Sequence, residues 1–405
     1  MNKRAKKTKV IATLGPASST KEIMLELVKA GADVFRINFS HADYELVKRN
    51  VDIIREINQE YGYNISILGD LQGPKLRVGV VKEGSFLNPG DVLTFTNEPC
   101  EGDSTKVFMT YEKFPQDVKV GERILIDDGK LVFEVIETNQ KDTVKAKTIQ
   151  GGPLSSKKGV NLPNTNVSLP ALTEKDIDDA KFMIENEFDW IALSFVRHAQ
   201  DIIDLKKLIQ AHSDFKIPII AKIEKPEGVK NIDEILLECD GLMVARGDLG
   251  VEVPMEEVPV IQKKLVDKAR YYSKPVIIAT QMMETMISSL TPTRAEVNDV
   301  ANNVLDGADA VMLSGETSVG KYPVDVVKNI TKIIKNIEST NLYEKKNDII
   351  EKITCVDDRF VTDMVCLNAV KIAETTGAAA IITLTHSGYT AFQISAHRPT
   401  SRIIV

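Results

Sequence analysis

The sequence lacks the features of several protein classes. None of its apolar stretches approaches the length of about 18 residues that a membrane-spanning helix needs. Its four cysteines include no CxxC pair, and its five histidines are scattered, with no HExxH motif. These absences argue against a membrane span, a disulfide framework and a zinc site. They favour a protein with reduced thiols, so we expect a cytoplasmic location.

The chain also lacks a net positive charge. Its net charge of -7 implies no general affinity for nucleic acid. The amino terminus is basic, but no apolar segment follows it as in a signal peptide, so a solvated terminus is the better interpretation. The basic residues there are Lys3, Arg4, Lys6, Lys7 and Lys9.

Apolar residues (43%) and charged residues (27%) are at ordinary levels for a globular protein, and the length suggests about two or three domains. The strongest pattern is an alternation of β-branched apolar runs with helical segments. The predicted strands are Lys9–Leu14, Val34–Phe39, Ile65–Leu71, Trp190–Phe195, Ile219–Glu224, Gly241–Ala245, Pro275–Thr280 and Ala310–Ser314. Helical patterns follow most of these strands, among them Lys21–Ala30, Tyr44–Glu60, Glu174–Asn186, Gln200–Ala211, Gly228–Glu238 and Val258–Tyr272.

Eight such units with nearly continuous apolar strands predict an α/β fold of the (β/α)8 TIM-barrel type. The alternative is a doubly wound open sheet. That fold needs a glycine-rich turn after its first strand, and the segment TLGP at 13–16 does not supply one.

Two other regions interrupt or follow the alternation. Residues 75–170 show short alternating strands and turn-forming pairs, which predict an inserted small β domain that could act as a lid. The barrel would then comprise 1–74 and 171–341. Residues 342–405 begin a partial α/β domain that stops inside a strand, so we expect it to be incomplete. Its predicted elements are Arg359–Thr375, Ala379–Leu384, Ala391–His397 and Arg402–Val405.

Polar residues follow the carboxyl ends of the barrel strands, where this fold places its active sites. Any one of them could be a cap or a salt bridge, but a ring of them favours catalysis. The ring comprises Arg36, Asn38, Ser40, His41, Asp70, Arg77, Ser194, Lys222, Glu224, Arg246, Gly247, Asp248, Thr280, Ser314 and Glu316.

Lys222 and Glu224 alternate along one strand and share a face, and we place Asp248 beside them on the next strand. Two carboxylates with few histidines favour Mg²⁺ or Mn²⁺. Lys222 and Arg36 add positive charge, and one contact to a phosphate charge at about 4 Å is worth about 4 kcal/mol. A metal, a lysine and an arginine together suit phosphoryl transfer.

The segment GETSVGK at 315–321 matches most of a Walker A loop. Tyr322 follows it where a serine or threonine is needed for magnesium, and the segment follows the last barrel strand. A nucleotide-binding P-loop is therefore not expected there.

At these residues the chain closely resembles bacterial-type members of the pyruvate kinase family. The matching segments are FRINFSH (35–41), SKKGVNLP (156–163), IIAKIE (219–224), GLMVARGDLG (241–250), IATQMM (278–283), PTRAE (292–296) and MLSGET (312–317). The resemblance implies glycolytic transfer of a phosphoryl group from phosphoenolpyruvate to ADP, giving pyruvate and ATP, by a cytoplasmic homotetramer.

The resemblance also implies roles for individual residues. Glu224 and Asp248 would bind Mg²⁺, Lys222 would stabilise the phosphoryl group, and Arg36 would hold phosphate. The substrate carboxylate would meet the backbone of Gly247 and Asp248 together with Thr280, and protonation would run through Thr280 and Ser314. The implied nucleotide-binding residues are Asn38, His41, Arg77 and Lys158.

One departure concerns potassium. Many members bind K⁺ through positions matching Asn38, Ser40, Asp70 and 71, but this chain has Leu71 instead of threonine and Lys75 instead of glutamate. Because the Lys75 ammonium can supply the single charge of K⁺, we predict activity without added potassium. The alternative is that Lys75 merely points to solvent.

In the last domain, the segment THSGYT resembles a loop that holds an effector phosphate in regulated members, although a plain turn is as good an interpretation. The residues concerned are Thr385, Ser387, Gly388 and Thr390. Two other functions stay open: a metal-dependent aldolase-type barrel acting on a 2-oxo acid, and a catalytically silent metabolite sensor.

Overall fold

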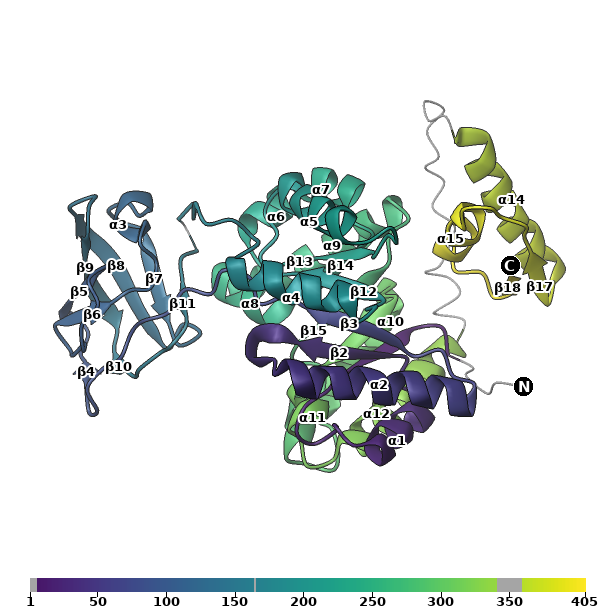
Figure 1. The fold of residues 1–405 in the computed structure, drawn as a ribbon, viewed down its shortest axis with the longest axis horizontal. Helices are drawn as coiled ribbons and strands as arrows, with labels where there is room; N and C mark the ends of the chain where they lie inside the picture. The colour runs from purple at the N-terminus through teal and green to yellow at the C-terminus, as the bar shows by residue number, and fades with distance from the viewer. Residues whose placement is uncertain (1–5, 164, 341–358) are drawn as a thin grey trace.

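The computed structural model describes residues 6–163, 165–340 and 359–405. Its centre is a closed barrel of parallel strands in the order β1-β16-β15-β14-β13-β12-β3-β2 (Figure 1). This confirms the TIM barrel predicted from the alternation. The barrel strands are β1 (Lys9–Thr13), β2 (Val34–Asn38), β3 (Ser66–Asp70), β12 (Trp190–Leu193), β13 (Ile219–Ile223), β14 (Gly241–Ala245), β15 (Val276–Ala279) and β16 (Ala310–Leu313).

Seven of the predicted strands ran one or two residues too far at their carboxyl ends. At two of these ends the backbone turns into the left-handed region, with φ of 55° at Phe195 and 69° at Thr280. Apolar periodicity cannot show where ladder hydrogen bonds stop, because a residue just past a strand can be as apolar as one within it. Ring residues such as Ser194, Glu224 and Thr280 therefore lie just past the strands, whereas Arg36, Asp70 and Lys222 lie within them.

The helices around the barrel begin at capping side chains. Thr20, Asp43, Thr173 and Thr293 each accept a backbone N–H in the first turn of a helix. One predicted helix, Gly228–Glu238, is instead two short helices that meet at Asn231. The surrounding helices are α1 (Lys21–Ala30), α2 (Tyr44–Tyr61), α4 (Glu174–Glu185), α5 (Ala199–His212), α6 (Pro226–Lys230), α7 (Ile232–Glu238), α9 (Val258–Tyr271), α10 (Arg294–Asp306) and α12 (Pro323–Glu338).

The apolar residues of the barrel form two layers. Side chains such as Phe35 and Ile67 pack between the strands and the helices, while Met243 and Ile220 belong to a smaller cluster inside the barrel. Because both faces of each strand are covered, the strands are apolar along nearly their whole length.

The inserted segment has a β core of its own. Its main sheet has the order β11-β7-β8-β9-β5-β6, and Phe95 packs edge-on against Phe133 at 5.7 Å between ring centres. Figure 1 shows this sheet beside the barrel, reached by the chain that leaves β3. Asn161 connects the two parts by donating to Glu252 of the barrel at 2.8 Å. The insertion contains β4 (Phe86–Leu87), β5 (Val92–Thr96), β6 (Lys106–Phe108), α3 (Phe114–Asp117), β7 (Arg123–Ile126), β8 (Leu131–Thr138), β9 (Thr143–Gln150), β10 (Gly152–Pro153) and β11 (Val160–Asn161).

The C-terminal segment lies at the opposite end of the molecule from the insertion (Figure 1). It contacts the amino-terminal side of the barrel, where Arg398 pairs with Asp309 at 2.7 Å and Lys7 donates to the carbonyl of Pro399 at 3.0 Å. Among the helices that the structure describes, none combines the length and apolarity needed to cross a membrane. The C-terminal segment contains α14 (Phe360–Thr376), β17 (Ala380–Ile382), α15 (Tyr389–Ala396) and β18 (Arg402–Ile404).

Candidate active site

Four charged side chains form one connected network at the carboxyl ends of β2, β3 and β13. Asp70 accepts from Arg36 Nε at 2.6 Å and from Lys222 Nζ at 3.0 Å. Lys222 also pairs with Glu224 Oε1 at 3.0 Å and donates to the Ser194 hydroxyl at 2.6 Å. The four charged side chains and Ser194 are all buried. The strands therefore bring together two cations and two carboxylates in alternating order.

The network fixes the charges of its members. Burial works against the charge on Lys222, but Asp70 and Glu224 outweigh it and raise the lysine pKa above its ordinary value. Burial also raises the pKa of Asp70, but Lys222 and Arg36 bring it below its ordinary range. Lys222 is therefore a fully charged ammonium held at a fixed position.

Asp248 does not lie on the strand beside Glu224, so that part of the sequence prediction was wrong. Strand β14 ends at Ala245, and Asp248 is an exposed residue in the first turn of α8 (Arg246–Glu252). A carboxylate is favourable in this position because the N-terminal turn of a helix carries partial positive charge. The strand pattern could not show that a helix begins directly at the strand end.

Glu224 and Asp248 remain electrostatically coupled. Burial is the largest cause that raises the pKa of Glu224 above its ordinary range; Lys222 opposes the rise and the Asp248 charge adds to it. Repulsion between two carboxylates is relieved by a divalent cation, so the pair fits a magnesium or manganese ion. In the described part of the chain no group of three or more His, Cys, Asp or Glu side chains forms a metal cage. An ion here would therefore take its other ligands from substrate and water, as Mg²⁺ commonly does.

Thr280 and Gly247 lie together at the ends of β15 and β14. The Thr280 hydroxyl accepts from the Gly247 N–H at 2.7 Å and donates to the carbonyl of Ala279 at 2.6 Å. Arg246 donates to the carbonyls of Thr280 and Gln281, at 2.8 and 3.1 Å, and pairs with Asp299 at 2.8 Å. Arg246 thus stabilises the left-handed backbone at residues 280 and 281, where φ is 69° and 50°.

Ser314 directly follows the neighbouring strand β16. Its backbone N–H donates to the buried carboxylate of Glu316 at 2.7 Å, and the other Glu316 oxygen accepts from the Met283 N–H at 3.0 Å. Glu316 belongs to the short helix α11 (Gly315–Ser318). Its two backbone contacts make Glu316 a structural residue that shapes the turns after β15 and β16.

The cations predicted to bind nucleotide make their hydrogen bonds within the insertion. Lys158 pairs with Asp127 at 3.0 Å, and Arg77 donates to the carbonyl of Lys157 at 3.0 Å. An isolated β-bridge joins Arg77 to Gly159, so Arg77 and Lys158 lie on neighbouring antiparallel segments. The insertion therefore brings these two cations together without bringing them to Lys222.

The positions considered for a monovalent cation offer few free oxygens. Asn38 Oδ1 accepts from the Ser40 N–H at 3.1 Å, and both Asp70 oxygens are paired. The carbonyl of Leu71 accepts from Ser194 at 2.7 Å. Lys75 is exposed, and within the described residues it forms no hydrogen bond or ion pair.

His41 and the residues of the effector loop are the remaining predicted site residues. Residues 39–41 form a short 3-10 helix after β2, but the His41 side chain lies outside what the structure describes. The predicted effector loop precedes α15, with Gly388 in the left-handed region at φ 80°. The Thr390 hydroxyl accepts from Thr383 at 3.2 Å, and Thr385 and Ser387 are near the surface.

The sequence analysis missed Thr13. Its hydroxyl accepts from Arg36 Nη1 at 3.0 Å and donates to the carbonyl of Leu313 at 2.8 Å. The available signal was its place: it is the polar residue at the carboxyl end of β1, the one barrel strand to which no such residue was assigned. Thr13 therefore completes the ring and fixes the arginine that contacts Asp70.

Comparison with known proteins agrees with this geometry. The family model described as "Pyruvate kinase, barrel domain" matches residues 5–327, and "Pyruvate kinase, alpha/beta domain" matches 363–405. The chain is 45% identical to pyruvate kinase 2 of Synechocystis sp. (98% of this chain, 67% of the relative). It is 44% identical to the pyruvate kinase of Geobacillus stearothermophilus (98% and 68%). A crystal structure of a pyruvate kinase from Cryptosporidium parvum superimposes with a TM-score of 0.92 at 37% identity (98% and 82%). The chain belongs to the pyruvate kinase family.

Proposed function

We propose that this chain is a phosphotransferase that moves the phosphoryl group of phosphoenolpyruvate to ADP, giving pyruvate and ATP in glycolysis. The observation that carries the proposal is the Arg36–Asp70–Lys222–Glu224 network at the barrel mouth. In it, Asp70 and Glu224 hold the two cations in fixed positions. Family membership does not favour the aldolase-type alternative. A silent sensor would not need this charged network at the carboxyl ends of the strands.

We assign the metal to Glu224 and Asp248, whose mutual repulsion supports the choice. A bound Mg²⁺ or Mn²⁺ would supply positive charge to the oxygens around the reacting phosphorus. Lys222 stabilises the phosphoryl group as it moves, and Arg36 holds it from the side of β2. The backbone N–H groups of Gly247 and Asp248, with Thr280, hold the substrate carboxylate.

The nucleotide and the proton have their own assignments. We assign Arg77 and Lys158 to the ADP phosphates, and Asn38 and His41 to the nucleotide as well. Thr280 and Ser314 pass the proton to the enolate. We propose residues 75–170 as the lid, 1–74 with 171–341 as the catalytic barrel, and 342–405 as a further α/β domain.

A coupled assay tests the activity directly. Folded protein incubated with phosphoenolpyruvate, ADP and Mg²⁺ should form pyruvate, detected through lactate dehydrogenase and NADH. Omission of ADP or Mg²⁺ should abolish the signal. No pyruvate from folded protein would remove the assignment.

Replacing Arg246 by methionine should lower kcat about tenfold to hundredfold. The variant loses the donor that stabilises the left-handed backbone at Thr280, and a small displacement of a positioned group can cost about a hundredfold in rate. Metal affinity should stay within about threefold, because Arg246 contacts neither carboxylate. Steady-state kinetics measure kcat, and a magnesium titration measures metal affinity. Equal losses of kcat and of metal affinity would show general disruption of the site.

We propose further that the activity does not need potassium. The support is the shortage of free oxygens, because Asp70, Asn38 and the Leu71 carbonyl already accept hydrogen bonds. The rate in a medium free of Na⁺ and K⁺, with tetramethylammonium as counter-ion, should rise less than about twofold when K⁺ is added. A many-fold rise would contradict the proposal.

Lys75 is the proposed source of the missing charge. Lys75→Glu should lower potassium-free activity about tenfold or more, because it replaces the proposed substitute cation with an anion. Lys82→Glu is the matched control, since Lys82 is another exposed lysine of the insertion. If Lys75→Glu keeps full potassium-free activity, Lys75 has no such role.

The remaining proposals rest on the family alone. They are a cytoplasmic location, a homotetramer, and an effector phosphate bound by Thr385, Ser387, Gly388 and Thr390. Light scattering gives the oligomeric state. Titration of a sugar phosphate against Ser387→Ala tests the loop.

A further inference from the structure

A cavity of about 420 Å³ opens at the amino-terminal mouth of the barrel, at the opposite ends of the strands from the candidate active site. Its wall includes the first residues of several strands, among them Ser66, Trp190 and Ala310. The volume lies within the range of about 300–1,000 Å³ that is typical of small-molecule sites.

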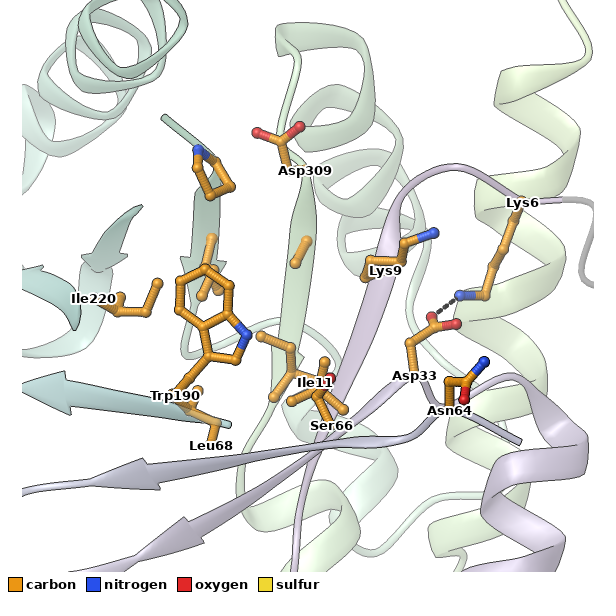
Figure 2. A pocket seen from close by; sticks show the side chains of 14 residues that line it. Lys6, Lys9, Ile11, Asp33, Asn64, Ser66, Leu68, Trp190, Ile220 and Asp309 are labelled. Carbon is orange, nitrogen blue, oxygen red and sulfur yellow. Dashed lines mark hydrogen bonds and ion pairs between the residues drawn. The ribbon is translucent and has the colours of Figure 1, made fainter. Parts of the chain in front are cut away.

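One side of this cavity is apolar. Figure 2 shows the Trp190 ring in the space between the strands, with Leu68 and Ile220 beside it and Ile11 across from it. Leu68, Ile220 and Ile11 are buried, whereas Trp190 is only half-buried. The exposed part of the indole ring offers a flat surface on which another ring can stack.

The other side is polar and carries the charged residues Lys6, Lys9, Asp33 and Asp309. Lys6 pairs with Asp33, and Asp309 pairs with Arg398. Lys9, at the start of β1, forms no side-chain hydrogen bond or ion pair within the described residues. Figure 2 places Lys9, Lys6 and Asp33 together at the edge of the cavity, away from the indole. Among the described residues, the exposed Lys9 ammonium thus has no anionic partner.

We propose that this cavity binds a small aromatic monoanion, with its ring on Trp190 and its acidic group toward Lys9. The apolar wall and the single unpaired cation complement such a molecule, because a neutral ring would leave Lys9 uncompensated and a dianion would exceed its charge. The site is separate from the catalytic one, so it does not depend on the proposed reaction.

Trp190 reports directly on this site because it is the only tryptophan of the chain. Phenylacetate, titrated into the full chain, should change the fluorescence excited at long wavelength in a saturable way. For a ligand of about ten heavy atoms we expect a Kd of about 1 mM or tighter. Phenylacetamide, which lacks the charge, and cyclohexylacetate, which lacks the aromatic ring, should each bind at least about fivefold more weakly.

Variants test the two halves of the cavity. Lys9→Gln should raise the Kd for phenylacetate at least about fivefold, whereas Lys264→Gln, an exposed lysine on α9, should leave it unchanged. Ala310→Leu should fill the cavity and abolish the response; if it does not fold, Ser66→Leu serves the same purpose. Phenylacetate should also raise the unfolding temperature of the original chain but not of the filled variant.

Three results would overturn the proposal: no saturable signal up to about 10 mM phenylacetate, equal binding of phenylacetamide, or equal binding to the filled variant.

Discussion

Replacing Lys222 by methionine is expected to lower kcat for pyruvate formation about a thousandfold. The variant removes one fixed positive charge from the position of the moving phosphoryl group. At about 4 Å and an effective dielectric near 20 that charge is worth about 4 kcal/mol, which corresponds to about three powers of ten in rate. The measurement is kcat at saturating phosphoenolpyruvate, ADP and Mg²⁺.

The same substitution disturbs a buried ion network, so stability needs its own control. Asp70 keeps Arg36, but Glu224 loses its cation and keeps only the N–H of Phe195, at 2.7 Å. Lys225→Met is the matched variant, because Lys225 also pairs at 2.6 Å with a buried carboxylate, that of Glu252. Both variants should unfold at lower temperature, but Lys225→Met should keep kcat within about tenfold. Similar rate losses in the two would remove the special role of Lys222.

Replacing Glu224 by glutamine is expected to raise the Kd for Mg²⁺ at least about a hundredfold. The amide is nearly isosteric but lacks the negative charge, and loss of even an indirect metal contact commonly costs about 10–100-fold. The site then has one carboxylate, Asp248, which is exposed. Calorimetric titration of Mg²⁺ measures the affinity directly, and the activation of kcat by Mg²⁺ gives an independent value.

Glu316→Gln is the control for this experiment. Glu316 is another buried carboxylate at the carboxyl end of a barrel strand, and it accepts two backbone N–H groups. Its replacement should lower the unfolding temperature. The glutamine side chain has only one acceptor oxygen, so one of the two backbone N–H groups loses its hydrogen-bond acceptor. Mg²⁺ affinity should not change. If it falls as far as in Glu224→Gln, Glu224 is not a specific metal ligand.

The two predictions rest on different parts of the network. Lys222 acts through a charge whose raised pKa keeps it protonated, whereas Glu224 acts through a carboxylate whose raised pKa reflects burial and the nearby Asp248. Metal binding tests Glu224 without any catalytic turnover. The rate at saturating metal tests Lys222 after binding is complete.

The sequence by itself determined the barrel and most of the charged ring. Eight apolar β-branched runs separated by amphipathic segments have few ways to bury both faces of each strand, and a closed parallel barrel is one of them. The polar residues that end these runs, such as Lys222 and Glu224, were visible because they break an apolar pattern. Their gathering follows from topology, since the carboxyl ends of all the strands meet at one mouth.

Only the tertiary structure decided the local geometry of the ring. Asp248 belongs to a helix, and Thr280 sits in a left-handed turn that Arg246 stabilises from another strand end. Thr13 joins the ring through Arg36, 23 positions along the chain. These features depend on where ladder hydrogen bonds stop and which side chains meet across strands. Periodicity carries no information on either, because both are set by contacts between residues far apart in the sequence.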